Sequence, residues 1–213
     1  MFWLERRVPI VIVPANAAYV GGVENQDFSF LVDAFCEPEF GRSVADWVQR
    51  PVSPYWKDYR ATQNETQEAS DVGFGALDDQ MSVGRILISH NWNDYCLVDD
   101  IAVDTLYRGL GVGRLLMDAC MDWARAERLA GIMLETQNNN IAACRFYERY
   151  GFELGGIDRL LYGGLSPRTG EIALFWYFSS TGRADRLDQA QLWKTTGNQS
   201  SRNFCPGCMP CPG

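Results

Sequence analysis

The hydrophobic pattern of the chain divides into segments with the period of strands and segments with the period of helices. Residues 8–13 are rich in β-branched side chains and predict a first strand. Apolar runs at 72–77, 81–89 and 95–103 are separated by short stretches of turn residues. This arrangement predicts an antiparallel meander of three strands.

The pattern changes to the period of a helix after the third of these runs. Apolar side chains recur there at intervals of three and four residues, at Leu116, Ala119, Cys120, Trp123 and Ala124. They predict an amphipathic helix, which is ended by Gly131. Residues 132–137 then predict a strand, and Asn140 is a typical N-cap for a second helix with Gly151 at its C-terminal cap.

The remaining segments complete the order of elements. Residues 27–35 carry apolar side chains at helical spacing, and residues 36–71 are irregular and contain three prolines. The irregular stretch is either a substrate-covering segment or a plain packing connection. Strands at 152–157 and 171–178 complete the order βαβββαβαββ, which predicts a mixed sheet with helices against it, an α+β architecture.

Residues 182–213 differ in character from the rest of the chain. They are polar and end in three cysteines, Cys205, Cys208 and Cys211. We interpret them as a mostly disordered tail outside a single domain that spans residues 1–181. A tetrahedral zinc site needs four ligands, and no fourth Cys or His lies near, so no metal site is predicted.

Charge and cysteine usage narrow the classes of function. The chain has 27 acidic and 19 basic residues, a net charge of −8. This balance argues against nucleic acid and against an anionic membrane surface as partners, and it favours a cationic ligand. Four scattered cysteines among apolar neighbours indicate reduced, buried thiols. The N-terminal apolar run is short and bounded by Pro14, so we expect a strand there rather than a signal peptide. We expect the protein to be cytoplasmic, and to be a monomer or a homodimer.

A glycine-rich segment joins the third meander strand to the first long helix. It reads Val-Asp-Thr-Leu-Tyr-Arg-Gly-Leu-Gly-Val-Gly-Arg over residues 103–114. Glycines let the backbone approach a ligand, and the helix N-terminus offers N–H donors and a favourable dipole. Together these features suit a pyrophosphate. The dinucleotide fingerprint would need glycine where Arg114 stands, and the Walker pattern is absent.

Two motifs carry a resemblance to a known family. Residues 108–113, Arg-Gly-Leu-Gly-Val-Gly, match the signature R/Q-x-x-G-x-G/A, and residues 140–152 resemble N-x-x-A-x-x-F-Y-x-x-x-G-F. Both are signatures of the GCN5-related N-acetyltransferases (GNAT), and they occur in the family's order. Within that family, segments between residues 72 and 178 resemble the streptothricin acetyltransferases, at 89–93, 99–104, 134–137, 143–147 and 171–177.

The resemblance implies a GNAT-type fold, a mixed and mostly antiparallel sheet flanked by helices, with acetyl-CoA as cosubstrate and no metal. Acetyl-CoA is expected where two neighbouring strands splay apart. The residues expected to contact it are Ile101, Ala102, Val103, Arg108, Gly109, Leu110, Gly111, Val112, Gly113, Arg114, Asn140, Ala143 and Tyr147. An acceptor amine would attack the thioester directly, without an enzyme nucleophile.

The acceptor amine must lose a proton, which points to a carboxylate. Asp99 and Asp100 are candidates, both as the base and as substrate ligands. On a regular strand they lie on opposite faces, so Asp99 is favoured because it shares a face with Ile101 and Val103. Glu135 is a further candidate for substrate binding or for the base.

Other side chains are assigned with their alternatives open. Tyr147 matches the family's general acid position, although it also belongs to an aromatic stripe on its helix. Trp176 is a candidate for stacking on a cationic substrate, with core packing as the alternative. His90, the single histidine, lies at a strand end and is expected to be structural.

The resemblance therefore implies an N-acetyltransferase that moves an acetyl group from acetyl-CoA to a primary amine of streptothricin, a small cationic acceptor. One alternative is a GNAT enzyme for another small amine or for a protein N-terminus. Another is a non-catalytic acyl-CoA-binding protein, which would bind coenzyme A without turnover.

Overall fold

The computed structural model describes residues 9–15, 26–58, 70, 72–164 and 170–180. All of them lie in one compact unit that ends at Ser180. The predicted tail at 182–213, with its three cysteines, lies outside the described residues. No helix in the described part is long and apolar enough to cross a membrane.

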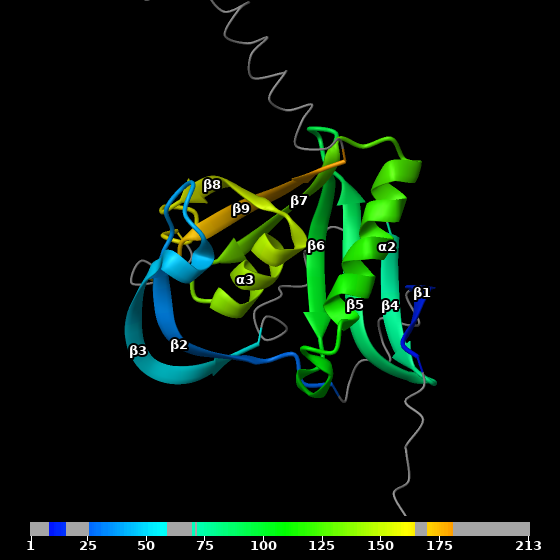
Figure 1. Cartoon of the computed structure of the whole chain (residues 1–213), viewed down its shortest axis with the longest axis horizontal. Coiled ribbons are helices and arrows are strands. Elements are labelled where there is room, and N and C mark those ends of the chain that lie inside the picture. Colours follow the sequence, from blue (N-terminus) through cyan, green and yellow to red (C-terminus); the bar gives the residue numbers. More distant parts are fainter. Residues whose placement is uncertain (1–8, 16–25, 59–69, 71, 165–169, 181–213) are drawn as a thin grey trace, which may run out of the picture. The chain divides into compact units, whose positions relative to one another are not determined.

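In the described residues, seven strands form one sheet in the order β1-β4-β5-β6-β7-β9-β8 (Figure 1). Their bounds are Val11–Ala15 for β1, Val72–Asp78 for β4, Met81–His90 for β5, Cys96–Val103 for β6, Gly131–Gln137 for β7, Glu153–Asp158 for β8 and Ala173–Ser179 for β9. Every neighbouring pair is antiparallel except β6 and β7. The predicted fold class and the predicted meander β4-β5-β6 are confirmed.

Two α-helices of the described chain cover one face of this sheet. Helix α2, Val112–Ala126, buries Leu116, Met117 and Cys120 against the strands, and helix α3 spans Ile141–Tyr150. Asn140 caps α3, because its side-chain oxygen accepts the Ala143 N–H at 3.2 Å. Gly151 ends α3 in the left-handed conformation at φ 114°, which a side chain would disfavour.

The N-terminal part corrects two predictions. Residues 27–35, predicted as a helix, contain the start of strand β2, Phe30–Glu37, and the irregular stretch contains strand β3, Val48–Lys57, paired antiparallel to it. A helical and a two-residue period both fit β2, but burial follows the second, since Val32, Ala34 and Cys36 are buried. Pairing with β3 therefore overrides the local spacing.

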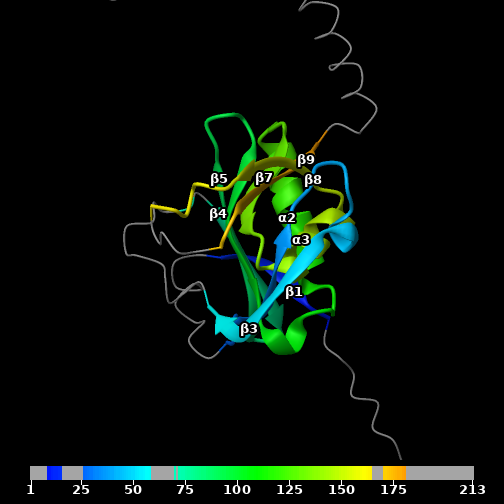
Figure 2. The same ribbon diagram turned by 90° about the vertical axis from the view of Figure 1, so that its left-hand side faces the viewer.

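Strand β3 was not predicted from the sequence because it contains Pro51 and Pro54. Within the described residues it pairs with β2 alone, so it is an edge strand, where proline is tolerated because one side of the strand needs no N–H donor. A 3₁₀ turn, Val44–Asp46, lies between the two strands and packs on α3 (Figures 1 and 2). Glu148 of α3 accepts hydrogen bonds there from Ser43 Oγ and the Val44 N–H, at 3.1 and 2.9 Å.

The hairpin is also tied to the end of β7 through Asn138. This side chain is 2% exposed, donates to the Cys36 carbonyl at 3.0 Å and accepts the Ile172 N–H at 2.9 Å. Its amide is thus satisfied by two segments distant in sequence. The four cysteines in the described chain are buried free thiols, as predicted: Cys36, Cys96, Cys120 and Cys144.

Candidate active site

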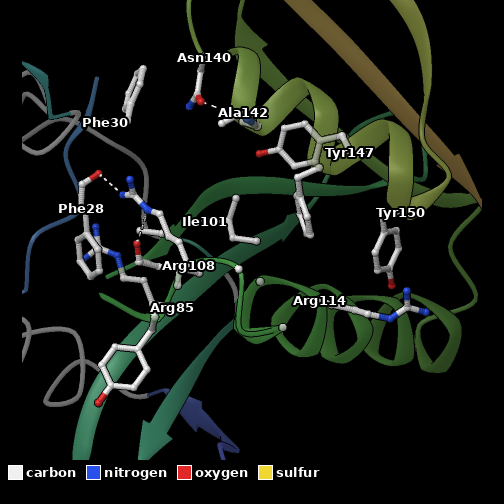
Figure 3. Close-up of a pocket in the computed structure, with 18 of the residues that line it drawn as sticks. Phe28, Phe30, Arg85, Ile101, Arg108, Arg114, Asn140, Ala142, Tyr147 and Tyr150 are labelled. Atoms are coloured by element: carbon white, nitrogen blue, oxygen red, sulfur yellow. Dashed lines mark hydrogen bonds between the residues drawn. The ribbon is translucent and has the colours of Figure 1, made fainter. Parts of the chain in front are cut away.

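A cavity of about 680 Å³ opens where β6 separates from β7. In the described residues, β6 pairs with β7 over Cys96, Leu97 and Val98, and residues 100–103 of β6 line the cavity instead. Its volume lies in the range usual for small-molecule sites. The splayed strands expected from the resemblance are therefore present, with α3 on the other side of the opening (Figure 3).

The glycine-rich segment forms one end of the cavity. Gly111 is the N-cap of α2 with φ 90°, a conformation that favours glycine, and no side chain caps the N–H groups of the first turn. Gly109, Gly113 and Arg114 also line the cavity. The side chains of Leu110 and Val112 lie outside the lining, Leu110 exposed and Val112 in the core. The N-terminus of α2 thus presents N–H donors to the cavity, which suits a pyrophosphate.

Arg108, predicted to contact the cofactor, is engaged mainly with the protein. Its guanidinium donates to the carbonyl of Phe28 at 3.0 Å (Figure 3). It also donates to the carbonyls of Val103 and Ser29, at 3.0 and 2.8 Å. Partial burial lowers its pKa, while Asp27 and Asp104 act in the opposite direction. The side chain therefore holds the segment before β2 against the end of β6, and that segment becomes a wall of the cavity.

Helix α3 supplies the opposite wall, including Asn140, Ala143 and Tyr147 from the predicted set. Tyr147 is 6% exposed, and its hydroxyl points into the cavity (Figure 3). Burial raises the pKa of this phenol, and the negative charges of Asp100 and Glu135 raise it further. The phenol stays protonated and faces the point where β6 leaves β7.

A β-bulge lies at the two neighbouring aspartates of β6, Asp99 and Asp100. Leu87 of β5 pairs with Asp100 and Ile88 pairs with Val98, so Asp99 is the extra residue. The regular alternation on which the preference for Asp99 rested is therefore broken. Asp100 lines the cavity with Ile101, Ala102 and Val103, whereas Asp99 lies outside the lining and accepts a hydrogen bond from Ser89 at 3.0 Å.

Asp100 is held by a charged partner that sequence analysis missed. Arg85 Nε donates to Asp100 Oδ2 at 2.7 Å, and the Phe28 ring lies 5.6 Å from the same guanidinium. Both side chains of the ion pair are mostly buried, at 9% and 13% exposure. A single arginine inside the apolar run 81–89 was the available signal, because a buried strand carries a charge only with a partner.

Glu135 is the exposed residue of strand β7. The hydroxyl of Tyr162 donates a hydrogen bond to its carboxylate. Neighbouring protein atoms reduce the hydration of the carboxylate and raise its pKa, Glu171 raises it further, and Tyr162 and Lys57 lower it. Glu135 lies outside the cavity lining, but its negative charge contributes to the raised pKa of Tyr147.

Two aromatic or basic candidates lie elsewhere. Trp176 is 2% exposed, with its ring 6.0 Å from Trp47 and 6.3 Å from Tyr147, so it packs in the core and does not reach a substrate. Trp176 therefore fits core packing, which was the alternative to stacking on a substrate. His90 lies at the end of β5, 3.4 Å from Asp94, outside the cavity lining.

The chain is similar to known acetyltransferases in sequence and in structure. The sequence model of the acetyltransferase (GNAT) family matches residues 41–152. Streptothricin acetyltransferase of Escherichia coli is 34% identical over 176 residues, covering 83% of this chain and 98% of the relative. Streptothricin acetyltransferase A of Bacillus subtilis (strain 168) is 37% identical over 153 residues, covering 70% and 88%.

Two solved structures of acetyltransferases are also similar to this chain. A Bacillus anthracis (strain Ames) protein, provisionally identified as a streptothricin acetyltransferase and solved in complex with acetyl coenzyme A, superposes with a TM-score of 0.70. It is 34% identical, and the match covers 80% of this chain and 99% of that one. Nourseothricin acetyltransferase superposes with a TM-score of 0.65 at 28% identity, covering 81% and 99%.

Proposed function

The chain belongs to the acetyltransferase (GNAT) family, and we propose that it transfers the acetyl group of acetyl-CoA to a primary amine of streptothricin. The acceptor is supported by the two relatives with that name, most of whose length this chain spans. The net charge of −8 favours a cationic acceptor. We place the reaction in the cytoplasm, in keeping with the free buried thiols of the described chain.

The residues at the start of α2 fit the donor. Bound acetyl-CoA would supply an acetyl group activated as a thioester. A side chain added at Gly109 or Gly111 would meet no atom within 4 Å, so these glycines face open space. The first-turn N–H groups of α2 have no side-chain cap and are positioned to bind a pyrophosphate. Ile101 and Val103 of β6 line the path from there to Tyr147.

Glu135 is the carboxylate best suited to the acceptor. A primary ammonium with a pKa of about 10.4 must lose a proton, which costs about 4–5 kcal/mol at pH 7. A base with a raised pKa lowers this cost more than one stabilised as an anion. The pKa of Glu135 is raised, whereas Asp100 is paired with Arg85. We therefore assign ammonium binding and proton acceptance, directly or through water, to Glu135.

Tyr147 completes the chemistry on the other side of the reacting centre. One observation carries the proposal: the hydroxyl of Tyr147 points into the same cavity that the glycine-rich end of α2 lines. From there it can protonate the departing sulfur as the amine attacks. Asp100, held by Arg85, keeps the adjacent wall of β6 in place.

A thiol-release assay tests this function. Purified protein with acetyl-CoA is offered streptothricin, a panel of small polyamines and peptides with free N-termini. Rapid release with streptothricin, and acetylated streptothricin by mass spectrometry, is the expected result. Release with the other amines alone would keep the acetyltransferase and exclude the acceptor. Coenzyme A binding without release for any amine would show a non-catalytic binding protein.

A further inference from the structure

A second glutamate lies beside the acceptor carboxylate and is already occupied by a lysine. Lys57, the last residue of β3, places Nζ 2.6 Å from Glu171 Oε1 and 2.7 Å from Gln137 Oε1. Asn139 donates to the same Glu171 oxygen at 3.0 Å. The lysine and glutamate side chains are 15% and 18% exposed. Partial burial and the amide partners keep this charged pair in one geometry.

The pair and Glu135 belong to one surface. Glu135 and Gln137 are two residues apart on β7, so their side chains lie on the same face of the strand. The neighbouring strand β9 begins beside Gln137, which pairs with Ala173, and Glu171 lies two residues before that partner. Lys57 therefore reaches from the β2–β3 hairpin to the end of β7 that carries the acceptor carboxylate.

We propose that Lys57 is a positioning residue of the acceptor site, held between Glu171 and Gln137 so that Glu135 alone of the two glutamates receives the acceptor ammonium. This proposal rests on the proposed function and specifies its acceptor end. The three charged groups Lys57, Glu171 and Glu135 carry a net charge of −1, which complements one ammonium. A polyamine acceptor would therefore bind through a single amine, which would hold it in one position relative to Tyr147.

The electrostatics of Glu135 agree with this geometry. The groups that face it are Tyr162 from the turn after β8, Lys57 from β3, Glu171 before β9, and Tyr147 from α3. Lys57 lowers the pKa of Glu135 and Glu171 raises it. Removing either partner should therefore displace the titration of Glu135, in opposite directions.

Four proteins test the proposal: the wild type, Lys57→Gln, Glu171→Gln, and the double variant. The first readout is the acidic limb of kcat/KM for streptothricin, in variants shown by circular dichroism to be folded. Lys57→Gln should move the limb to higher pH and Glu171→Gln to lower pH. The double variant should return the limb close to the wild-type position, because the net charge is −1 again.

The split between kcat and KM separates positioning from support of the fold. Lys57→Gln leaves two carboxylates for one ammonium, so kcat should fall about tenfold while the KM for acetyl-CoA stays within about twofold. Lys57→Arg keeps the charge and should stay within about threefold of the wild type. Loss of turnover in folded Lys57→Gln without displacement of the acidic limb would overturn the proposal.

A direct titration keeps this test separate from that of the proposed function. The carboxyl ¹³C resonance of Glu135, assigned with Glu135→Gln, is followed against pH in the same proteins without any acceptor. Opposite displacements in the two single variants are expected. Unchanged titration in both would overturn the role of Lys57 whichever amine the wild type acetylates, whereas a failure with streptothricin alone would remove the acceptor of the proposed function.

Discussion

The guanidinium of Arg85 on β5 and the carboxylate of Asp100 on β6 form a mostly buried ion pair in the wall of the active site, with 2.7 Å between Nε and Oδ2. The pair forms because the bulge at Asp99 turns Asp100, rather than its neighbour, toward the cavity. Removing one partner would leave the other charge buried without compensation, which is more costly than removing both.

Arg85→Leu should therefore lower the free energy of unfolding by about 3–5 kcal/mol. The double variant Arg85→Leu/Asp100→Leu should lose markedly less, because no buried charge is left behind. Urea denaturation of the two proteins and the wild type measures the difference. Equal losses in both variants would show that packing around Arg85, and not the charge on Asp100, sets the stability of this wall.

Tyr147→Phe should reduce turnover by about 10²–10⁴, the usual contribution of a general acid, because it removes the proton donor while keeping the ring. Calorimetric affinity for acetyl-CoA should change by less than about threefold, since the helix contacts are retained. Tyr95→Phe is the matched control, because that ring packs on Tyr177 at 5.4 Å outside the cavity lining. Normal turnover in Tyr147→Phe would remove this residue from the mechanism.

The pH dependence of activity should follow Glu135. Its pKa is raised, so kcat/KM for the acceptor should fall as the pH drops through a value above the ordinary one for glutamate. Glu135→Gln should lose most activity and also this acidic limb. A variant that retains both activity and limb would exclude Glu135 as the base.

Stability should respond to Glu135 with the opposite sign. A carboxylate whose folded pKa exceeds its unfolded pKa binds protons more tightly in the folded state, so stability falls as the pH rises between the two values. Glu135→Gln should therefore gain stability relative to the wild type at pH 7, and this gain should vanish below the unfolded pKa. Denaturation at pH 4 and pH 7 measures it, and a variant less stable at pH 7 would contradict the expected sign.

Gly111→Ala should weaken binding of acetyl-CoA. The left-handed φ of 90° makes a side chain there cost about 1–3 kcal/mol, and relief of that strain would reorient the first N–H groups of α2. Gly41→Ala is the matched control, because that glycine has φ 76° with nothing within 4 Å and lies in the β2–β3 connection. Both variants should lose similar stability, and only Gly111→Ala should raise the KM for acetyl-CoA.

The sequence by itself determined the elements whose cause is local. The apolar stripe at Leu116, Cys120 and Ala124 specifies α2, and Asn140 and Gly151 specify the two ends of α3. Side chains three or four residues apart meet on a helix, and a cap bonds to the adjacent turn, so these signals need no distant partner. The glycine-rich motif is equally local, and it located the helix start that faces the cavity.

The tertiary structure alone decided which side chains meet. Asp100, and not the favoured Asp99, lines the cavity because of a bulge in β6. A bulge depends on how β6 pairs with β5, and the alternation of residues along β6 alone does not predict that pairing. The hairpin β2–β3 forms because pairing outweighs a helical spacing and tolerates proline at an edge. Lys57 and Glu171 are 114 residues apart in sequence, and packing of that hairpin on the end of β7 brings their charges together. Contacts of this kind arise from the packing of whole elements, so a local sequence pattern cannot predict them.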